Sequence, residues 1–439
     1  MVSAPFLVSA PGKVILFGEH AVVYGKPAIA AAVSLRTFLL TTRNAAEFSD
    51  VVTLEFPDVD LQYSWKIQSL PWNAVPKRSI DTVRPPSELN TALMEALERG
   101  LVAHLSPLQR SAAVAFLYLY LCLCSADMPG MTLSVRSTLP IGAGLGSSAS
   151  VSVCLAAALC LLSGEVSPPE KKGEGDGDFN AANYASIELI DAWAFLGERC
   201  IHGNPSGIDN AVASHGGAVM YQRMSKGNPN VREAMRNFPP LKLILIDSRQ
   251  PRRTAVQVAN VATLLQNYPL VTEPILNGIG ALTSQAYKLL LMPKGKCDDA
   301  WEEQLRELVR VNHGLLVALG VSHPKLEAIR MAADELEIGE TKLTGAGGGG
   351  CAITLVRRDV EESRIFELKQ RLDGHGFEVY ETSLGGFGVG CLFPTNSNAA
   401  EWEEWEEKLF SLHHMLGLGD REDIQKTVGV GSIDGWEFW

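Results

Sequence analysis

The stretch PIGAGLGSSAS, residues 140–150, combines glycines with small and hydroxyl side chains in a way that suits phosphate binding. Bare glycines let backbone N–H groups approach a polyphosphate. The Ala- and Leu-rich segment that follows predicts a buried helix beginning at Ser147 and Ser148. A helix N-terminus supplies unpaired donors and a positive dipole end, and a serine hydroxyl can ligate Mg²⁺. A tight turn with a serine as the helix cap is the structural alternative.

Two other nucleotide-binding motifs do not account for these glycines. The ATPase pattern GxxxxGK followed by Ser or Thr occurs nowhere in the chain. The dinucleotide pattern GxGxxG fails in the first stretch because position 147 is serine. A second GxGxxG, at Gly345, Gly347 and Gly350, leads into the strand-like CAITLV, where a dinucleotide site needs a helix. The phosphate loop of another kind of kinase and a plain turn both stay open.

Two carboxylates flank the turn HGNPSG. Mg²⁺ takes one or two carboxylates beside phosphate and water oxygens, so Glu198 with Ser148 would meet its needs; pairing of Glu198 with Arg199 is the alternative. Asp209 follows Ser206, which we expect to cap a short helix. An Asp in the first turn also complements the helix dipole, so the local sequence leaves its role open.

Three further stretches carry polar groups among apolar residues. Lys13 stands at the mouth of an apolar strand, where a lone lysine usually reaches solvent. Glu19 and His20 are adjacent, without metal-ligand spacing or a second histidine nearby. The stretch TGAGGGGC, residues 344–351, has four consecutive glycines, which is more than one turn needs and favours close approach of the backbone to a phosphate.

The elements that must position these groups are strands and helices mixed without regular alternation, which predicts an α+β fold. Strand-like segments crowd the first third of the chain: PFLVSA, KVILF, TFLLTTR, VVTLEF and YSWKI. We expect helical structure over about 88–124, a strand in MTLSVRS, and the helix after the glycine stretch. LKLILID then opens a second half with long helical segments around 254–335.

The length of 439 residues exceeds what one core supports, so we expect two domains, 1–235 and 236–395. Residues 164–180 lack apolar periodicity and predict a mobile surface insertion. An acidic tail, 396–439, completes the chain, and its predicted helix places apolar side chains on one stripe. We expect this stripe to pack as a cap; its members are Trp402, Trp405, Leu409, Leu412 and Leu416.

Composition excludes several classes of protein. The net charge of −12 and pI near 5.3 argue against a nucleic-acid-binding surface. The eight cysteines lack paired CxxC spacing and predict reduced thiols in a cytoplasmic protein. The longest apolar run, about thirteen residues from Ala112, is too short to span a membrane. The apolar N-terminus has no basic segment and is broken by Pro11 and Gly12, so we expect a first strand rather than a signal peptide.

Over roughly residues 5–395 the chain resembles the GHMP family of small-molecule kinases. The resemblance rests on SAPGKVILFGEHAVVYGKPAI from Ser9, LPIGAGLGSSAS, ERCIHGNPSGIDNAVASHGG from Glu198 and KLTGAGGGGC, which occur in the family's order. The first and third stretches are closest to the members that phosphorylate mevalonate. The resemblance implies an N-terminal domain like ribosomal protein S5 and a ferredoxin-like C-terminal domain, with the active site in the cleft between them.

The resemblance also implies roles for individual residues, with ATP and Mg²⁺ as cofactors. Asp209 would be the catalytic base and Lys13 the catalytic cation. The implied nucleotide contacts are Pro140, Gly142, Ala143, Gly144, Leu145, Gly146, Ser147, Ser148, Gly347 and Gly348. The implied contacts of the substrate mevalonate are Lys13, Glu19, His20, Asp209 and Thr254. The implied Mg²⁺ ligands are Ser148 and Glu198.

Expected partners follow from the same resemblance. We expect a homodimer that binds neither nucleic acid nor membranes, and inhibition by prenyl diphosphates that compete with ATP. Rival functions are another kinase of the family, such as one acting on phosphomevalonate or galactose, a non-catalytic ligand sensor, and an NADP-dependent reductase. The presence of Lys13, Glu198 and Asp209 argues against a sensor, and the failed dinucleotide pattern argues against a reductase.

Overall fold

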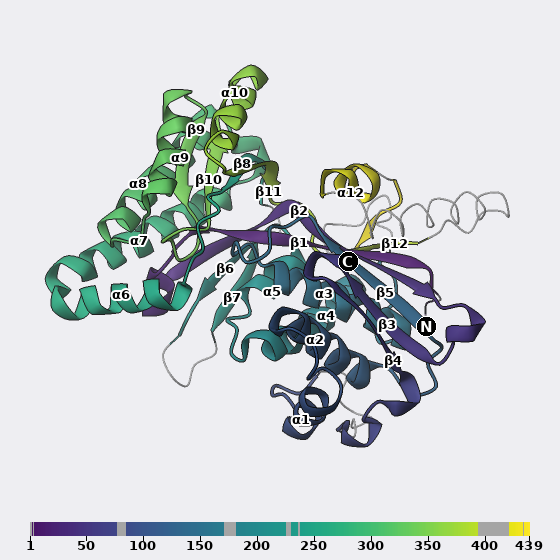
Figure 1. Cartoon of the computed structure of the whole chain (residues 1–439). Helices are drawn as coiled ribbons and strands as arrows, with labels where there is room; N and C mark the ends of the chain where they lie inside the picture. Colours follow the sequence, from purple (N-terminus) through teal and green to yellow (C-terminus); the bar gives the residue numbers. More distant parts are fainter. Residues whose placement is uncertain are drawn as a thin grey trace.

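The computed structural model of the chain describes residues 2, 4–76, 85–170, 181–224, 230–235, 238–393, 421–432 and 434–439. Helices α1 to α5 cover one part of a large mixed sheet and α6 to α10 cover another (Figure 1). The predicted stripe from Trp402 to Leu416 and residues 171–180 of the predicted insertion lie outside the described residues. The domain boundary expected at 235/236 and the homodimer stay predictions.

The elements confirm the mixed, irregular order that the sequence predicts. The strands are β1 Phe6–Phe17, β2 Pro27–Arg43, β3 Val51–Phe56, β4 Leu61–Lys66, β5 Met131–Ser137, β6 Ala218–Gln222, β7 Val231–Met235, β8 Leu241–Asp247, β9 Gly339–Leu343, β10 Cys351–Val356, β11 Glu378–Leu384, β12 Gly390–Leu392 and β13 Glu437–Phe438. The helices are α1 Thr91–Gly100, α2 Pro107–Leu123, α3 Ser147–Ser163, α4 Ala181–His202, α5 Ile208–His215, α6 Thr254–Asn267, α7 Pro269–Leu290, α8 Asp299–Ala318, α9 Pro324–Glu335, α10 Glu362–Asp373 and α12 Arg421–Val428.

The helical stretch expected over 88–124 is two helices. The N-cap Asn90 accepts a hydrogen bond from the backbone of Leu93, which starts α1. Ser106 and Gln109 form a capping box around Pro107, which starts α2. Among the described residues, no helix combines the length and hydropathy needed to cross a membrane.

Strand β2 links the two parts of the sheet. Along its 17 residues it pairs with β1, with β5 near one end and with β6 near the other. A further pairing, Val33 with Leu384, joins β2 to β11 and so to the order β11-β8-β10-β9. One strand therefore holds the layers of both parts in a fixed relation.

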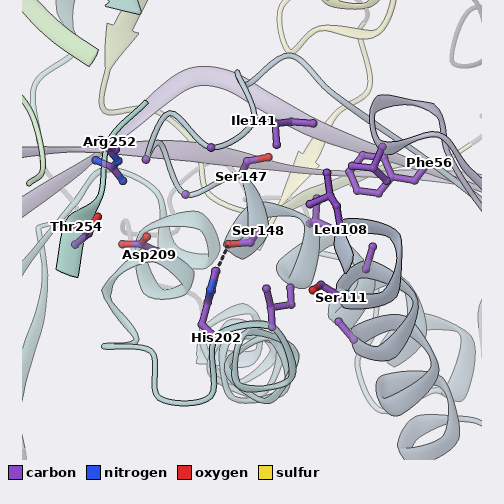
Figure 2. Close-up of a pocket in the computed structure, with 18 residues that line it drawn as sticks. Phe56, Leu108, Ser111, Ile141, Ser147, Ser148, His202, Asp209, Arg252 and Thr254 are labelled. Carbon is purple, nitrogen blue, oxygen red and sulfur yellow. Dashed lines mark hydrogen bonds between the residues drawn. The ribbon is translucent and has the colours of Figure 1, made fainter. Parts of the chain in front are cut away.

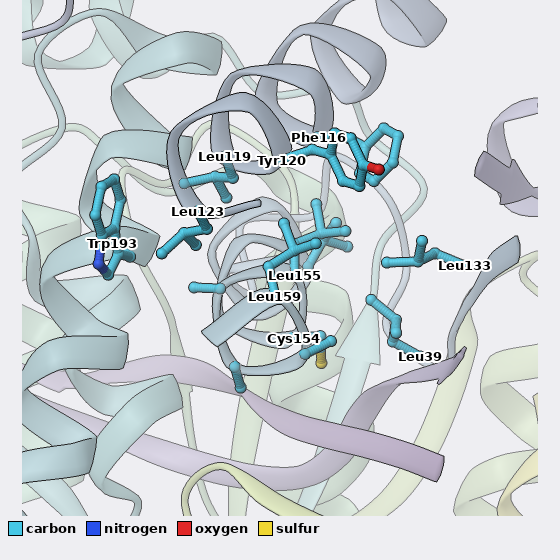
Figure 3. Close-up of a cluster of buried hydrophobic side chains, with 14 of the residues drawn as sticks. Leu39, Phe116, Leu119, Tyr120, Leu123, Leu133, Cys154, Leu155, Leu159 and Trp193 are labelled. Atoms are coloured by element: carbon cyan, nitrogen blue, oxygen red, sulfur yellow. The ribbon is translucent and has the colours of Figure 1, made fainter. Parts of the chain in front are cut away.

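The first core lies between the sheet and helices α2, α3 and α4. Helix α3 is buried at every position from 149 to 162, as predicted from a sequence that is apolar on most sides. Figure 3 shows its Leu155 and Leu159 between Phe116 and Leu119 of α2 and Leu39 and Leu133 of the sheet. The N-terminus of α3 is thus held in place because the rest of this helix is buried on all sides.

A second core packs helices α7 to α10 against β8, β9 and β10. Ile244 and Ile246 of β8 meet side chains from these helices, including Ile279, Ile329 and Leu368. Burial of each such side chain contributes about 1.5–3 kcal/mol relative to exposure. The active-site candidates come from both parts of the fold: Lys13 from β1, Ser148 and Glu198 from α3 and α4, and Thr254 from the start of α6.

Candidate active site

A cavity of about 410 Å³ opens where α2, α3, α4 and α5 meet the segment before α6. Figure 2 shows its two ends: Ser148, His202, Asp209, Arg252 and Thr254 at one, and an apolar wall at the other. The apolar wall consists of Phe56, Val59, Leu108, Ala112, Ala115, Ile141, Val151 and Ile201. The cavity can therefore hold a ligand with one polar and one apolar end.

The predicted phosphate loop leads directly into α3, whose first residues are Ser147 and Ser148 as expected. Gly146 is the N-cap, with φ of 72°, a left-handed conformation that favours glycine. No side chain caps this end of α3, so the serine-cap alternative is wrong. The first N–H groups of α3 have no partner within the helix and are available to an anion at the cavity.

Lys13 and Asp209 meet at the base of the loop. Lys13 Nζ lies 3.3 Å from Asp209 Oδ1 and donates a hydrogen bond to Gly144 O at 3.1 Å. The Lys13 side chain is 8% exposed and that of Asp209 is 36% exposed, so the carboxylate is the member of the pair that a ligand can reach. The Lys13 backbone also donates to Leu145 O at 2.8 Å, which ties β1 to the loop.

Asp209 is the second residue of α5, in its first turn as predicted. The predicted cap by Ser206 is wrong, because Gly207 adopts the left-handed conformation and starts the helix one residue later. Ser206 Oγ instead accepts a hydrogen bond from the backbone of Ile208 at 3.3 Å. This position of Asp209 is compatible with compensation of the helix dipole and with a role at the cavity. The pairing of Asp209 with Lys13 favours a role at the cavity.

Glu198 is a buried carboxylate without a full set of partners. Its residue is 3% exposed, and its Oε1 has no hydrogen-bond partner among the described residues. Burial, followed by the nearby negative charge of Asp209, raises the pKa of Glu198 to about 7, although Ser148 and Lys13 lower it. Ser148 Oγ lies 3.1 Å from His202 Nε2. An uncompensated carboxylate oxygen beside a hydroxyl is the donor set that a hard cation such as Mg²⁺ prefers.

The described residues contain no cluster of three or more metal-ligating His, Cys, Asp or Glu side chains. A Mg²⁺ site needs only one or two carboxylates, with water and phosphate oxygens in the remaining positions, so Glu198 and Ser148 would be sufficient for it.

Arg252 is a site residue that the sequence interpretation missed. A Cβ added to Gly144 would lie 1.8 Å from its guanidinium, and one added to Gly345 would lie 2.5 Å from it. Only glycine at position 144 permits this approach. Burial lowers the pKa of Arg252, and no described carboxylate forms an ion pair with it. Arg252 thus presents a cation without a fixed partner to the cavity, between the two glycine stretches.

The signal for Arg252 was the sequence PRR before Thr254, but the pattern does not tell which arginine faces inward. Thr254 starts α6 and lines the cavity beside Arg252. Gly347 and Gly348 do not line it: a Cβ on Gly347 would meet the backbone of Val321, and one on Gly348 would meet Gln257. The second glycine stretch lies behind Arg252.

Glu19 and His20 are also outside the cavity lining. Glu19 is ion-paired with Lys342, and its Oε2 accepts from Asn312 Nδ2 at 3.0 Å. His20 Nε2 donates to Ala346 O at 2.9 Å, and burial lowers the pKa of His20. In this structure, His20 binds the second glycine stretch to the segment after β1, and Glu19 binds Lys342 of β9, just before that stretch.

Comparisons with known proteins identify close relatives. Residues 110–217 match the family model described as GHMP kinases N terminal domain, and residues 302–373 match GHMP kinases C terminal. The chain is 46% identical to the mevalonate kinase of Candida albicans, with 100% of both chains covered. It is 40% identical to that of Homo sapiens, with 90% of this chain and 97% of the human one covered.

Solved structures agree in fold. The structure of L. major mevalonate kinase in complex with R-mevalonate superposes with a TM-score of 0.62 at 23% identity, covering 88% of this chain and 97% of that one. The mevalonate kinase of Methanococcus jannaschii superposes with a TM-score of 0.61 at 23% identity, covering 88% and 99%. This likeness shows the two-part α+β architecture.

The raised pKa of Glu198 predicts that this carboxylate destabilises the empty protein at alkaline pH. Its folded pKa of about 7 exceeds the ordinary value of 4.5, so the folded state binds the proton more tightly between these values. Stability is lost as pH rises through this window. Glu198→Gln should therefore raise the free energy of unfolding at pH 8 by about 1–3 kcal/mol, with the difference fading near pH 5.

The measurement is denaturant unfolding of both proteins at pH 5 and pH 8 without added nucleotide or divalent cation. Glu302→Gln is the matched control: Glu302 is equally buried but ion-pairs with Arg306 and Arg358, so its loss should destabilise the protein at pH 8. A Glu198→Gln protein less stable than wild type at pH 8 would show that the carboxylate is compensated.

Proposed function

The chain belongs to the GHMP kinases and, among them, to the mevalonate kinases, and we propose that Lys13 and Asp209 carry out its phosphoryl transfer. The reaction moves the γ-phosphoryl group of ATP to the C5 hydroxyl of (R)-mevalonate, giving 5-phosphomevalonate and ADP. The membership agrees with the family resemblance that the four sequence stretches indicate.

One observation carries the residue assignment: a cavity-facing carboxylate 3.3 Å from a buried lysine, at the foot of a glycine loop and a helix N-terminus. In the proposed step the C5 oxygen forms a bond to the γ-phosphorus while the bond from that phosphorus to the β,γ-bridging oxygen breaks. Asp209 accepts the hydroxyl proton, because a primary alcohol barely ionises near neutral pH. The electron pair of the broken bond stays on ADP.

Lys13 supports this step electrostatically. Its positive charge stabilises negative charge on the attacking oxygen and on the phosphoryl group during transfer. Its hydrogen bond to Gly144 O holds the ammonium group at the loop, with little freedom to move into solvent. The low exposure of its side chain strengthens these interactions, since less water screens the charge.

The glycine loop and α3 bind the phosphates of ATP. Backbone N–H groups of the stretch from Gly142 to Ser148 and the positive end of α3 contribute partial charges, and Arg252 contributes a full one. The apolar wall around Leu108 and Ile141 receives the adenine base of ATP. Gly347 and Gly348 support the phosphate site indirectly, by allowing their stretch to pack behind Arg252.

Glu198 and Ser148 would hold Mg²⁺. When bound, Mg²⁺ neutralises charge on the β- and γ-phosphates and orients them. The protein's part is to keep an uncompensated oxygen of Glu198 and the Ser148 hydroxyl at one place, the latter held by His202.

Substrate contacts divide into direct and indirect ones. Thr254 and Asp209 line the cavity and can contact mevalonate directly. Glu19 and His20 are proposed to act on the substrate pocket through the glycine stretch that they hold, since Lys342 and Ala346 occupy their polar atoms.

Asp209→Asn tests the catalytic base. Asn keeps the shape of Asp and can stay in the first turn of α5, but it cannot accept the proton. We expect kcat to fall about 10²- to 10⁴-fold, with small changes in the affinities for ATP and mevalonate and in the melting temperature. Steady-state kinetics with a coupled ADP assay and a melting curve on the same preparation check this. Retention of more than about a tenth of the wild-type kcat would exclude Asp209 as the base.

Ser148→Ala tests the cation site. Loss of one oxygen ligand should raise the Mg²⁺ concentration needed for half-maximal rate, by about tenfold if the ligand contributes about 1.4 kcal/mol. The rate is titrated with Mg²⁺ at fixed total ATP, after correction for free nucleotide. Ser163→Ala, at the far end of the same helix, is the control and should leave the Mg²⁺ dependence unchanged. Identical titrations for Ser148→Ala and wild type would remove Ser148 from the cation site.

The cavity also supports the proposal that prenyl diphosphates inhibit the enzyme. A diphosphate fits the start of α3. The apolar wall that receives the adenine base of ATP can also receive part of a prenyl chain. We expect farnesyl diphosphate to raise the apparent KM for ATP without changing kcat. Initial rates over a grid of ATP and farnesyl diphosphate concentrations decide this; inhibition that ATP does not overcome would refute a shared site.

A further inference from the structure

Asp191 is a buried carboxylate that the proposed reaction does not use. It lies on α4, is 9% exposed, and does not line the cavity. Its side chain faces the first turn of α5, the helix that carries Asp209. A buried charge costs stability unless it is paired and hydrogen-bonded, and Asp191 is hydrogen-bonded to Asn210 and ion-paired with Arg232.

Asp191 binds the first turn of α5 through Asn210. The Asn210 side chain donates to Asp191 Oδ1 at 2.5 Å and lies 3.3 Å from Asp191 O. Asn210 is 1% exposed, so water does not compete for this amide. The residue next to the proposed base is therefore fixed to α4 by both the side chain and the backbone of one aspartate.

Arg232 of β7 adds a second connection. Its Nη1 lies 3.5 Å from Asp191 Oδ2 and donates to Gly207 O at 3.4 Å. Gly207 is the N-cap of α5. One guanidinium thus joins the carboxylate on α4 to the start of α5, and the first turn is held at two successive points, the cap and Asn210.

These contacts set the rotation of the turn. Neighbouring residues on an α-helix point about 100° apart, because a turn takes 3.6 residues. With Asn210 directed at α4, Asp209 is directed at Lys13 and the cavity. A small rotation of the turn would move the Asp209 carboxylate by an ångström or more, and a displacement of that size can reduce a rate about 10²-fold.

We propose that Asp191 is a positioning residue: through Asn210 and Arg232 it fixes the first turn of α5, so that the Asp209 carboxylate faces Lys13 and the reacting hydroxyl. The inference rests on the proposed role of Asp209 and adds to it the group that orients this side chain.

Burial raises the pKa of Asp191 to about 6, while Arg232 and Asn210 lower it and Glu188 raises it. Among the described residues, Arg232, Asn210, Glu188 and Ser214 are the polar groups that affect this carboxylate. The Asp191 carboxylate is thus charged near neutral pH at a cost in folding stability. This cost fits a role in positioning better than a role in stabilising the fold.

The other end of α5 offers a matched control. Glu188, one turn earlier on α4, lies 3.4 Å from His215, the last residue of α5. Glu188→Gln replaces the carboxylate that contacts His215 between the same two helices, but at the end of α5 that is remote from Asp209. If catalysis required only that α5 be attached to α4 at some point, Glu188→Gln and Asp191→Ala would lower kcat to a similar extent.

The test measures kcat, both KM values and melting temperature for Asp191→Ala, Asp191→Asn and Glu188→Gln. We expect Asp191→Ala to lower kcat about 10- to 100-fold, with KM for ATP and mevalonate within about twofold of wild type. Asp191→Asn retains an acceptor for Asn210 and should recover much of the loss. Glu188→Gln should keep kcat within about twofold. If Asp191→Ala does not fold, Arg232→Met removes the ion pair from an exposed position and is measured instead, with a smaller loss of kcat expected.

A double-mutant cycle separates positioning from general destabilisation. If Asp191 acts through Asp209, then Asp191→Ala should cause almost no further loss of kcat in an Asp209→Asn background. A full additional loss there, a folded Asp191→Ala with kcat within twofold of wild type, or an equal loss in Glu188→Gln would each overturn the proposal. The two proposals fail differently: an active Asp209→Asn overturns the base, whereas an inactive Asp209→Asn beside a fully active Asp191→Ala overturns only the positioning role.

Discussion

The active site depends on a buried ion pair between residues that are 323 positions apart, Glu19 and Lys342. Both side chains are almost fully buried, at 1% and 0% exposure, so the pair is favourable only if its remaining hydrogen-bonding capacity is met. Lys342 also donates to Leu343 O at 2.8 Å, and Asn312 donates to Glu19. Burial lowers the pKa of Lys342, and the Glu19 carboxylate raises it. The end of β1 and the segment just before the second glycine stretch are thereby held together, and Gly345 of that stretch lies close to Arg252, since a Cβ on Gly345 would lie 2.5 Å from the guanidinium.

Buried charged side chains that support the proposed site have hydrogen-bond or ion-pair partners. Charged side chains at the proposed ligand-binding positions lack some of these partners. Lys342, Glu19 and Asp191 have partners on several sides, whereas an oxygen of Glu198 has none and Arg252 lacks an ion pair among the described residues. Incomplete groups of this kind destabilise the empty protein. In the proposed reaction the phosphates of ATP and a divalent cation would compensate these groups, so the same residues that reduce stability would supply binding energy. The pKa of Glu198, raised to about 7 mainly by burial, reflects this incomplete compensation.

The local part of the fold and of the site could be predicted from the sequence, and the long-range part could not. The start of α3 at Ser147 follows from glycines that precede an apolar helix, and the position of Asp209 in a first turn follows from PSGIDNAV. The sequence could not tell Arg252 from Arg253, because that choice depends on glycines at positions 144 and 345 of other segments. The sequence also could not identify Lys342 as the partner of Glu19, because this contact joins segments that are far apart in the chain. Ser206 failed as the predicted cap because a left-handed glycine directly after it competes for the helix start.

The C-terminal residues show how far this dependence on distant segments extends. Strand β13 pairs with the short strand β12, and Phe438 stacks on Phe387 with ring centroids 4.3 Å apart. Phe438 also covers Arg36, whose guanidinium donates to Phe387 O and Gly388 O. The loop that contains these carbonyls hydrogen-bonds to the residues at the end of α5, through Val389 N with Ser214 O and Gly217 N with Gly386 O. Figure 1 shows α12 on the side of the sheet away from α2 and α4, whereas β12 is a strand of the sheet beside β1. The last residues of the chain therefore help to hold the far end of the helix whose first turn carries Asp209, although they lie outside the cavity.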